Sequence, residues 1–339
     1  MKIISDIKGK NVIVSPLDWG LGHASRIIPV IKILQKNSCT VTVVCGKGGY
    51  ALMKAELPDT EIIMLKEKRI KYPKGKIGLI SFLRWIFVMG FNTVNEKIKI
   101  GKTARQKHTQ IIISDNRYGL CFKNLDCYII THQIAPRVPW KSNFLQKLSD
   151  KIFKKELSKF KKVLIPDFEE GFSLTGPLAA DLASGNEKYE KIGILSRFSN
   201  SEDENQTFEY DYLILISGQE KQRTVFENLL LKQIKNTDKK IIFVRGITDK
   251  NAPKLENFAN VVFYNSLTGN DLEFAFKSSR TVVCRAGYST ICDFLALKKN
   301  AVIIPTPGQT EQEFLAERLN GKFGIIAVNQ DVLQKNVNF

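Results

Sequence analysis

The sequence lacks the features of a secreted, zinc-binding or membrane-spanning chain. Its six cysteines include no Cys-x-x-Cys pair and mostly lie within apolar segments, so we expect reduced core thiols rather than disulfides or zinc ligands. The residues after Met1 contain neither the apolar stretch nor the cleavage pattern of a signal peptide. The most prominent apolar run, Ile77–Phe91, is too short to span a bilayer and contains Arg84. These absences predict a cytoplasmic protein.

Acidic residues are also scarce relative to basic ones. The chain has 51 Lys and Arg against 34 Asp and Glu, a formal net charge of +17. Such an excess favours an anionic partner. The sequence has no RNA-binding aromatic signature, helix-turn-helix pattern or zinc-finger spacing, so we do not expect a nucleic acid. An acidic membrane surface and phosphorylated substrates are the partners that agree with the charge.

Much of the positive charge lies in two segments, Lys66–Lys76 and Lys141–Lys162. Within the second, apolar residues keep helical spacing over Lys147–Lys162, which predicts an amphipathic helix with a basic face. Lysines also flank Ile77–Phe91, where Trp85 is suited to the headgroup level of a membrane. We therefore expect a peripheral protein on the inner face of the cell membrane. The alternatives are a core helix at Ile77–Phe91 and a merely solvated basic helix.

Strand-like runs alternate with helical patterns along the whole chain. At 339 residues, with 43% apolar residues, the chain is long enough for two domains with full cores. The predicted strands are Asn11–Ser15, Thr40–Cys45, Glu61–Leu65, Ile111–Ser114, Cys127–Thr131, Lys162–Pro166, Tyr212–Ile216, Lys240–Arg245, Val261–Tyr264, Thr281–Cys284 and Ala301–Ile304. Helices are predicted between them, such as Ala24–Gln35 and Lys47–Ala55. Alternation of this kind predicts an α/β fold of two Rossmann-like, doubly wound domains, 1–200 and 208–339, joined by the polar segment Ser199–Thr207.

The segment Arg285–Asp293 has the pattern of a phosphate-binding turn. It follows the predicted strand Thr281–Cys284, turns at Gly287 and opens a helix, so that backbone N–H groups and the helix dipole point at one spot. Thr290 and Asp293 share a face of this helix. A hydroxyl for a phosphate and a carboxylate for a ribose diol are what a nucleotide needs.

A second polar loop, Pro305–Glu313, repeats this layout after the next strand, with a helix from about Thr310. Thr310-x-x-Glu313 also has the spacing of a capping box. The alternative to a ligand site is therefore that Thr310 and Glu313 only bind the free backbone N–H groups at the start of their own helix. Open α/β sheets bind ligands beyond the carboxyl ends of their strands. Two consecutive polar loops at that edge therefore indicate a nucleotide-sugar site.

The first half of the chain contains a candidate catalytic base. The strand Asn11–Ser15 leads into a glycine turn with His23 at the start of a helix, where a neutral imidazole can accept a proton from a sugar hydroxyl. Asp115 follows the strand Ile111–Ser114 and is placed to orient His23; its alternative roles are to cap the loop or to pair with Arg117. His132 and Gln133 follow a third strand at the same edge, as cleft-lining residues.

Together these segments resemble the GT-B glycosyltransferases, in particular the MurG-like branch with a family 28 C-terminal domain. Gly20-Leu-Gly-His23 is similar to the family's glycine-histidine loop, Arg285–Asp293 to its donor-binding turn, and Gln309–Glu313 to its sugar-contacting loop. The resemblance implies two domains facing a cleft, the first binding the acceptor and the second the donor. The implied donor-binding residues are Gly22, Ser217, Gly218, Gln219, Arg285, Gly287, Ser289, Thr290, Asp293, Gln309, Gln312 and Glu313. The implied acceptor cleft contains Trp19, Asn116, Arg117, His132 and Gln133.

The resemblance also implies a reaction: inverting transfer of a sugar, such as an N-acetylhexosamine, from a UDP-sugar to a glycan or lipid-linked acceptor. His23 is the implied base and Asp115 its partner. We expect no cofactor and no metal ion, since the chain contains no Asp-x-Asp sequence, and helix N-termini with Arg285 are expected to offset the phosphate charge. Two other functions stay open: a nucleotide-sugar hydrolase of the same fold, and a non-catalytic sugar-nucleotide-binding accessory protein.

Overall fold

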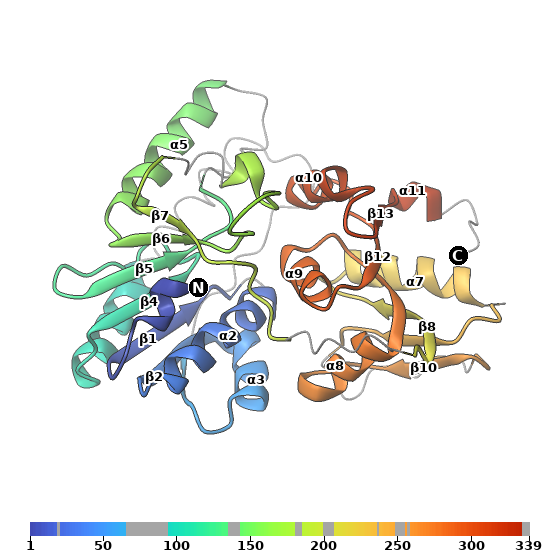
Figure 1. The fold of residues 1–339 in the computed structure, drawn as a ribbon, viewed down its shortest axis with the longest axis horizontal. Helices are drawn as coiled ribbons and strands as arrows, with labels where there is room; N and C mark the ends of the chain where they lie inside the picture. Colours follow the sequence, from blue (N-terminus) through green and yellow to red (C-terminus); the bar gives the residue numbers. More distant parts are fainter. Residues whose placement is uncertain are drawn as a thin grey trace. The chain divides into compact units, whose positions relative to one another are not determined.

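The computed structural model describes residues 1–18, 21–65, 94–134, 143–179, 185–198, 207–235, 237–247, 255 and 258–333. The chain divides into two compact units, Met1–Leu195 (unit 1) and Ser196–Phe339 (unit 2), each built on a parallel sheet (Figure 1). Trp19, Gly20, Ile77–Phe91 and most of the segment Ser199–Thr207 lie outside the described residues.

Unit 1 contains a sheet of seven strands within the described residues, in the order β3-β2-β1-β4-β5-β6-β7. The strands are β1 Asn11–Pro16, β2 Thr40–Gly46, β3 Glu61–Leu65, β4 Ile111–Asp115, β5 Asp126–Ile130, β6 Lys162–Ile165 and β7 Tyr189–Lys191. The strand order reverses between β1 and β4, and there Pro16 pairs with Asp115 in register. Such a switch point is where open α/β sheets bind ligands.

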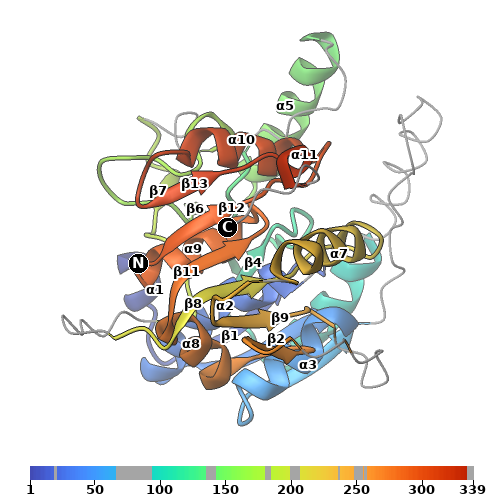
Figure 2. The ribbon, with the colours of Figure 1, turned by 90° about the vertical axis from the view of Figure 1, so that its right-hand side faces the viewer.

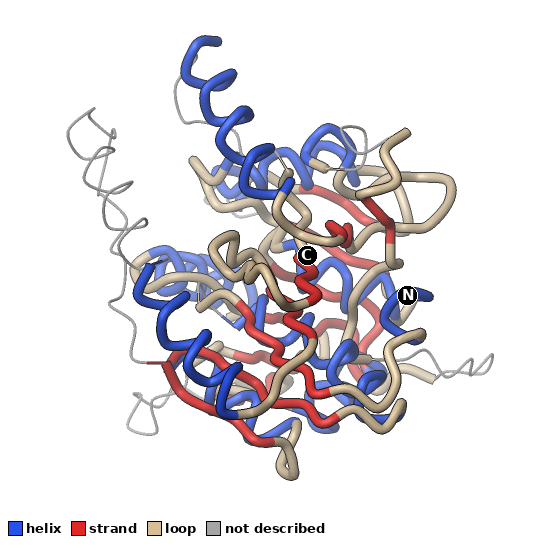
Figure 3. The backbone as a smooth tube through the Cα atoms, turned by 90° about the vertical axis from the view of Figure 1, so that its left-hand side faces the viewer, coloured by secondary structure: helices blue, strands red, loops and turns tan. Residues whose placement is uncertain are grey.

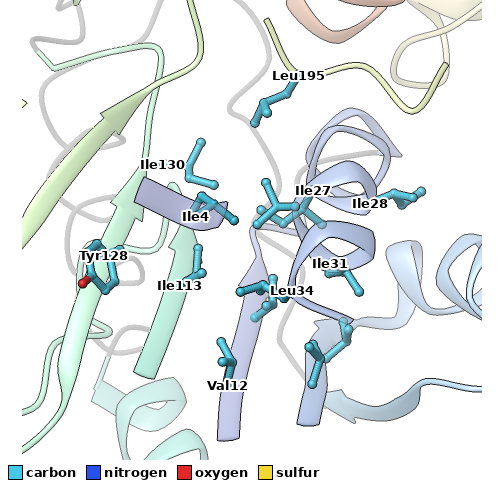
Figure 4. Close-up of a cluster of buried hydrophobic side chains, with 14 of the residues drawn as sticks. Ile4, Val12, Ile27, Ile28, Ile31, Leu34, Ile113, Tyr128, Ile130 and Leu195 are labelled. Carbon is cyan, nitrogen blue, oxygen red and sulfur yellow. The ribbon is translucent and has the colours of Figure 1, made fainter. Parts of the chain in front are cut away.

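The helices of unit 1 pack beside this sheet, as Figure 3 shows with strands in red and helices in blue. They are α1 Lys2–Ser5, α2 Leu21–Lys36, α3 Lys47–Glu56, α5 Asn143–Ser158 and the 3-10 turn η1 Gly176–Leu178, with residues 94–106 also helical. Helical spacing places Ile27, Ile31 and Leu34 of α2 on one face, where all three are fully buried. They pack in one cluster with Val12 and Ile113 of the sheet (Figure 4). This packing fixes the start of α2 beside the switch point.

Unit 2 contains six strands within the described residues, in the order β10-β9-β8-β11-β12-β13 (Figure 2). The strands are β8 Tyr210–Leu215, β9 Ile241–Val244, β10 Val261–Tyr264, β11 Ser279–Cys284, β12 Asn300–Ile303 and β13 Ile325–Ala327. The helices are α7 Gln222–Ile234, α8 Gly269–Ser278, α9 Tyr288–Ala296, α10 Thr310–Leu319 and α11 Gln330–Leu333. The order reverses between β8 and β11, so the loops that follow these two strands flank the switch point of unit 2.

The prediction of an α/β fold with two parallel sheets is confirmed, and most predicted strands lie within a residue or two of their observed ends. One helix prediction was wrong at its end. α5 stops at Ser158, and Lys162 begins β6 instead of ending the helix. The reason is burial, since Phe160 turns into the core of unit 1 and the Lys161 N–H donates to the Cys127 carbonyl of β5.

Within the part of the chain that the structure describes, no helix is long and apolar enough to cross a membrane. All six cysteines are free thiols, and only Cys121 is not buried. His108 is exposed, in a turn just after the 94–106 helix.

Candidate active site

His23 and Asp115 meet at the switch point of unit 1. Asp115 is the last residue of β4, and His23 lies in the first turn of α2, which follows the neighbouring strand β1. The His23 Nδ1 atom lies 3.2 Å from each carboxylate oxygen of Asp115. The Asp115 side chain is fully buried and that of His23 is 15% exposed. The two residues that the sequence placed at one sheet edge are therefore in direct contact.

A third residue, Arg26, completes this cluster and was missed by the sequence analysis. Arg26 lies one turn after His23 on α2, and its Nε donates to Asp115 Oδ2 at 2.8 Å. Its Nη2 atom donates to the other carboxylate oxygen. The remaining terminal nitrogen, Nη1, lies 2.7 Å from His132 Nδ1; because a guanidinium can only donate, that ring nitrogen is the acceptor. Asp115 is thus held by a bidentate ion pair as well as by His23.

These contacts determine the protonation of the pair. Burial alone would raise the pKa of Asp115, but Arg26 and His23 outweigh burial and hold it well below its ordinary value. The pKa of His23 is lowered, first by burial and then by Arg26 and His132, against the opposing effect of Asp115. At neutral pH a carboxylate can only accept, so the neutral imidazole carries its proton on Nδ1. The lone pair on His23 Nε2 is then the site that can accept a proton.

Two of the residues expected to line the acceptor cleft, Asn116 and Arg117, follow Asp115 directly and have partners of their own. Asn116 has a left-handed backbone (φ 54°), and its N–H donates to the Ile130 carbonyl at 3.0 Å. The Nε of Arg117 donates to the Pro16 carbonyl at 2.8 Å, and its Nη1 forms an ion pair with Glu96 at 2.7 Å. The arginine found to pair with the Asp115 carboxylate is Arg26, and the contacts described for Arg117 are with Pro16 and Glu96.

The loop after β5 places the second histidine of the cluster. The rings of His23 and His132 lie 6.4 Å apart between centroids. The next residue, Gln133, donates its backbone N–H to Thr131 Oγ1 at 3.1 Å and accepts at its carbonyl from the Tyr118 hydroxyl at 3.0 Å. These hydrogen bonds fix the loop that carries His132. In the first turn of α2, the carbonyl of Gly22 accepts from the Ser25 hydroxyl at 3.0 Å.

In unit 2, three helix N-termini follow strands at the carboxyl edge of the sheet. The loop Ser217–Gln219 leads from β8 toward α7, Gly287 is the N-cap of α9, and Gln309 is the N-cap of α10. None of these three helices has a side-chain hydrogen bond at its cap. Gly218 has a φ of 112°, a conformation that favours glycine. An anion at this edge would meet the positive ends of three helix dipoles.

Asp293, the residue expected to bind a ribose, is buried in the second turn of α9. Its Oδ1 atom accepts a hydrogen bond from the Ser196 hydroxyl at 2.7 Å, and its Oδ2 atom lies 3.9 Å from Arg197 Nε. Thr290 lies one turn earlier on the same helix and is partly exposed, as is its neighbour Ser289. The carboxylate therefore faces the first residues of unit 2 in this structure.

The guanidinium of Arg285 is almost fully buried and supports the second loop. Its Nη1 atom donates to the carbonyls of Ile304 (3.3 Å) and Pro305 (3.2 Å), just after β12. Its Nη2 atom donates to Gln330 Oε1 at 2.7 Å, and the group stacks on the Phe226 ring at 3.9 Å. Burial lowers the pKa of Arg285 to about 10. The structure thus places this charge against the backbone of the loop Pro305–Glu313.

Gln309, Gln312 and Glu313 are joined to that loop by hydrogen bonds. Gln312 Oε1 accepts from the Thr306 N–H at 2.9 Å, and its Nε2 donates to Gln309 Oε1 at 2.5 Å. Glu313 accepts from the Gly308 N–H at 2.8 Å. The capping-box alternative was wrong in its first residue, because the N-cap is Gln309 rather than Thr310. Three polar side chains are thereby brought together at the start of α10.

Comparisons with known proteins concern the fold and the C-terminal half of the chain. Residues 218–337 match the glycosyltransferase family 28 C-terminal domain. The calicheamicin glycosyltransferase is similar in structure (TM-score 0.65, 12% identity, covering 96% of this chain and 87% of that one). So is Arabidopsis thaliana UGT89C1 complexed with UDP-L-rhamnose (TM-score 0.60, 13% identity, 97% and 89%). A third is the spinosyn rhamnosyltransferase complexed with thymidine diphosphate (TM-score 0.61, 11% identity, 96% and 88%).

No curated protein sequence matches the chain. At these identities the structural likeness defines the fold, which is that of the two-domain GT-B glycosyltransferases. The match to the family 28 C-terminal domain lies within unit 2. The two-domain fold expected from the sequence is confirmed, and the match supports the expected family for the C-terminal half.

Proposed function

We propose that this protein is an inverting, metal-independent glycosyltransferase that uses a UDP-sugar. The observation that carries the proposal is the His23–Asp115 contact at the switch point of unit 1, in a chain whose unit 2 has a family 28 C-terminal domain. Unit 1 binds the acceptor and supplies the base, and unit 2 binds the donor. The relatives complexed with UDP-L-rhamnose and with thymidine diphosphate support a nucleotide-sugar donor.

The reaction is a single displacement at the anomeric carbon. The acceptor hydroxyl gives its proton to His23 Nε2 while its oxygen forms the new bond to that carbon. The bond from the carbon to the diphosphate oxygen breaks, and UDP leaves with the electron pair through an oxocarbenium-like transition state. Asp115 stabilises the imidazolium that forms, as the carboxylate of a catalytic triad does. One displacement with a base inverts the anomeric configuration.

The donor is bound at the carboxyl edge of the unit 2 sheet. The N-termini of α7, α9 and α10 offset the charge of the diphosphate, with Ser217–Gln219, Gly287 and Ser289 at the first two of them. Thr290 contacts a phosphate and Asp293 exchanges its Ser196 partner for a ribose hydroxyl. Gln309, Gln312 and Glu313 contact the transferred sugar. Arg285 acts through the loop that its guanidinium holds, because its donors bind the carbonyls of Ile304 and Pro305.

A surface of unit 1 supports a membrane-bound acceptor, as expected for the MurG-like branch. The apolar side chains Leu148 and Ile152 of α5 are 46% and 52% exposed, and Val94 and Ile98 of the 94–106 helix are 58% and 65% exposed. Exposed lysines surround them: Lys97, Lys99, Lys102, Lys147, Lys151, Lys154 and Lys155. We name this set, from α5 and the 94–106 helix, the basic helix surface.

The two helices of the basic helix surface are linked through residues 118–122. The Tyr118 ring contacts Phe153 of α5 at 5.0 Å between centroids, and Lys97 of the other helix lies 5.6 Å from the Phe122 ring centroid. Figures 1 and 2 show α5 extending beyond the sheet of unit 1. Exposed apolar side chains among lysines are suited to an anionic lipid surface. The proposed acceptor is accordingly a lipid-linked glycan at the inner face of the cell membrane.

The function is tested by measuring UDP release from a panel of UDP-sugars, with and without membrane lipid extract as the source of acceptor. Release that requires the extract supports a transferase. Release in buffer alone contradicts the proposal and identifies a nucleotide-sugar hydrolase. Binding of a UDP-sugar without release under either condition also contradicts it and identifies an accessory protein. His108→Ala, which changes an exposed histidine, is the matched control for His23→Ala.

A further inference from the structure

Arg26 and His23 compete for one carboxylate. Both project from α2, one turn apart, and both contact the two oxygens of Asp115. Arg26 is only 2% exposed, so water screens its charge little. Its Nη1 atom lies 2.7 Å from Nδ1 of His132, which follows the neighbouring strand β5. These three hydrogen bonds hold the guanidinium in one place.

The charge of Arg26 weakens the tendency of Asp115 to favour the protonated imidazole of His23. A buried carboxylate that paired with histidine alone would favour the protonated ring, because an opposite charge nearby stabilises the charged form. Arg26 neutralises the carboxylate, and it also repels a proton on the ring directly. Within the described residues, the charged and titratable groups that act on His23 are Asp115 from β4, Arg26 from α2 itself and His132 from the β5 loop. Of these, only Asp115 favours the protonated ring.

We propose that Arg26 is a positioning residue that fixes Asp115 with its bidentate fork and, by sharing that carboxylate, keeps His23 neutral and able to accept a proton. Asp115 then serves mainly to orient the ring through Nδ1, and the proton-accepting lone pair on Nε2 is preserved at neutral pH. The protonation state follows from the contacts alone. Its consequence for catalysis rests on the proposed function.

The direct test is an NMR titration of the histidine ring signals. The chain has only three histidines, so His108→Gln and His132→Gln variants assign the signals. In the wild-type protein we expect His23 to titrate below the ordinary histidine pKa of 6.5. A wild-type His23 that is protonated at pH 7 overturns the proposal without the need for any variant.

Two substitutions of Arg26 separate the effect of its positive charge from the effect of its bidentate hydrogen bonds. In Arg26→Gln the titration of His23 should move to higher pH, whereas Arg26→Lys keeps the positive charge and should leave the midpoint nearer to wild type. Equal midpoints in the wild type and a folded Arg26→Gln variant would contradict the proposal. These titrations need no substrate, so they test the role of Arg26 independently of the proposed function. If the midpoint shifts but the protein transfers no sugar, the role of Arg26 is upheld and the proposed function fails.

The pH dependence of activity distinguishes this role from a merely structural one. If Arg26 keeps His23 neutral, then Arg26→Gln should be slow near neutral pH and regain kcat/KM as the pH rises and the ring loses its proton. Damage to the fold would instead lower kcat/KM by the same factor at every pH. A profile parallel to that of the wild type overturns the proposal.

Discussion

The Ser196 hydroxyl donates a 2.7 Å hydrogen bond to Asp293, the carboxylate proposed to bind the donor ribose. Ser196 is the first residue of unit 2 and Asp293 lies on α9, so the contact joins the segment that enters the unit to its proposed donor site. Arg197 lies beside the same carboxylate, at 3.9 Å. UDP binding would therefore exchange one hydroxyl partner of Asp293 for another.

Asp293→Ala should weaken UDP binding by about 1–3 kcal/mol, because the ribose hydroxyls lose a charged acceptor. Isothermal titration calorimetry measures this effect. Ser196→Ala is the matched control, since it removes the same internal hydrogen bond but keeps the carboxylate, and it should retain or improve the affinity. An unchanged affinity in folded Asp293→Ala would remove this residue from the donor site.

The pH profile of the wild-type enzyme should report the lowered pKa of His23. A base must be neutral to accept a proton, so kcat/KM should fall as the pH falls through the pKa of His23. Because burial lowers that pKa from the ordinary value of 6.5, the acid limb should lie below pH 6.5. An acid limb well above pH 7 would contradict the environment described for His23.

Asp115→Asn should destabilise unit 1 by roughly 3–5 kcal/mol, because it leaves the buried charge of Arg26 without its partner. Urea unfolding measures the loss. The double variant Arg26→Met with Asp115→Asn should regain part of the stability, since no uncompensated charge remains. Equal losses in the single and double variants would show that the ion pair is not what stabilises this region.

Acid should destabilise unit 1 through the same residue. The pKa of Asp115 is lowered in the folded protein, so the unfolded chain binds the proton first. The stability that this carboxylate contributes is present above its unfolded pKa of about 3.9 and is lost as the pH falls toward the lower folded value. Unfolding free energies measured down to pH 3 should therefore fall less steeply in the double variant than in the wild type.

Much of this arrangement could be predicted from the sequence, because local patterns determine it. Alternating apolar runs and helical spacing gave the strands and their order along the chain, and the position of Asp115 after its strand placed it beside His23. Arg26 was missed although Asp115 is about as far from it in sequence as from His23, because arginine on a helix is mostly exposed and nothing local shows that this one is buried against a carboxylate. The one available signal was its position one turn after His23 on an otherwise apolar face. Arg117, nearer to Asp115 in sequence, forms an ion pair with Glu96.

Unit 2 shows the same limit. The glycine turns and helix starts of unit 2 follow from local sequence, and they lie where expected. Two long-range contacts were not predicted: the hydroxyl of Ser196 on Asp293, and the burial of Arg285 against the carbonyls after β12. Both depend on how segments far apart in the sequence pack together, and composition and spacing do not encode that.

Binding to lipid vesicles should depend on the basic helix surface. Replacing Leu148 and Ile152 by Ser should reduce co-sedimentation with vesicles that contain anionic lipid, and added salt should reduce it further, with each lysine near the surface contributing about 1 kcal/mol. The matched control replaces Val225 and Val332, which are 44% and 40% exposed in unit 2. Failure of the wild-type protein to bind anionic vesicles at low salt would contradict a membrane acceptor.

The most direct test of the central claim is the turnover of His23→Ala with the UDP-sugar and acceptor that the panel identifies. The proposed mechanism predicts a loss of about 10²–10⁴-fold in kcat, with UDP affinity nearly intact, because the variant lacks only the base. His108→Ala should behave as wild type. A His23→Ala enzyme that keeps wild-type turnover would contradict the mechanism and direct attention to His132 as the base.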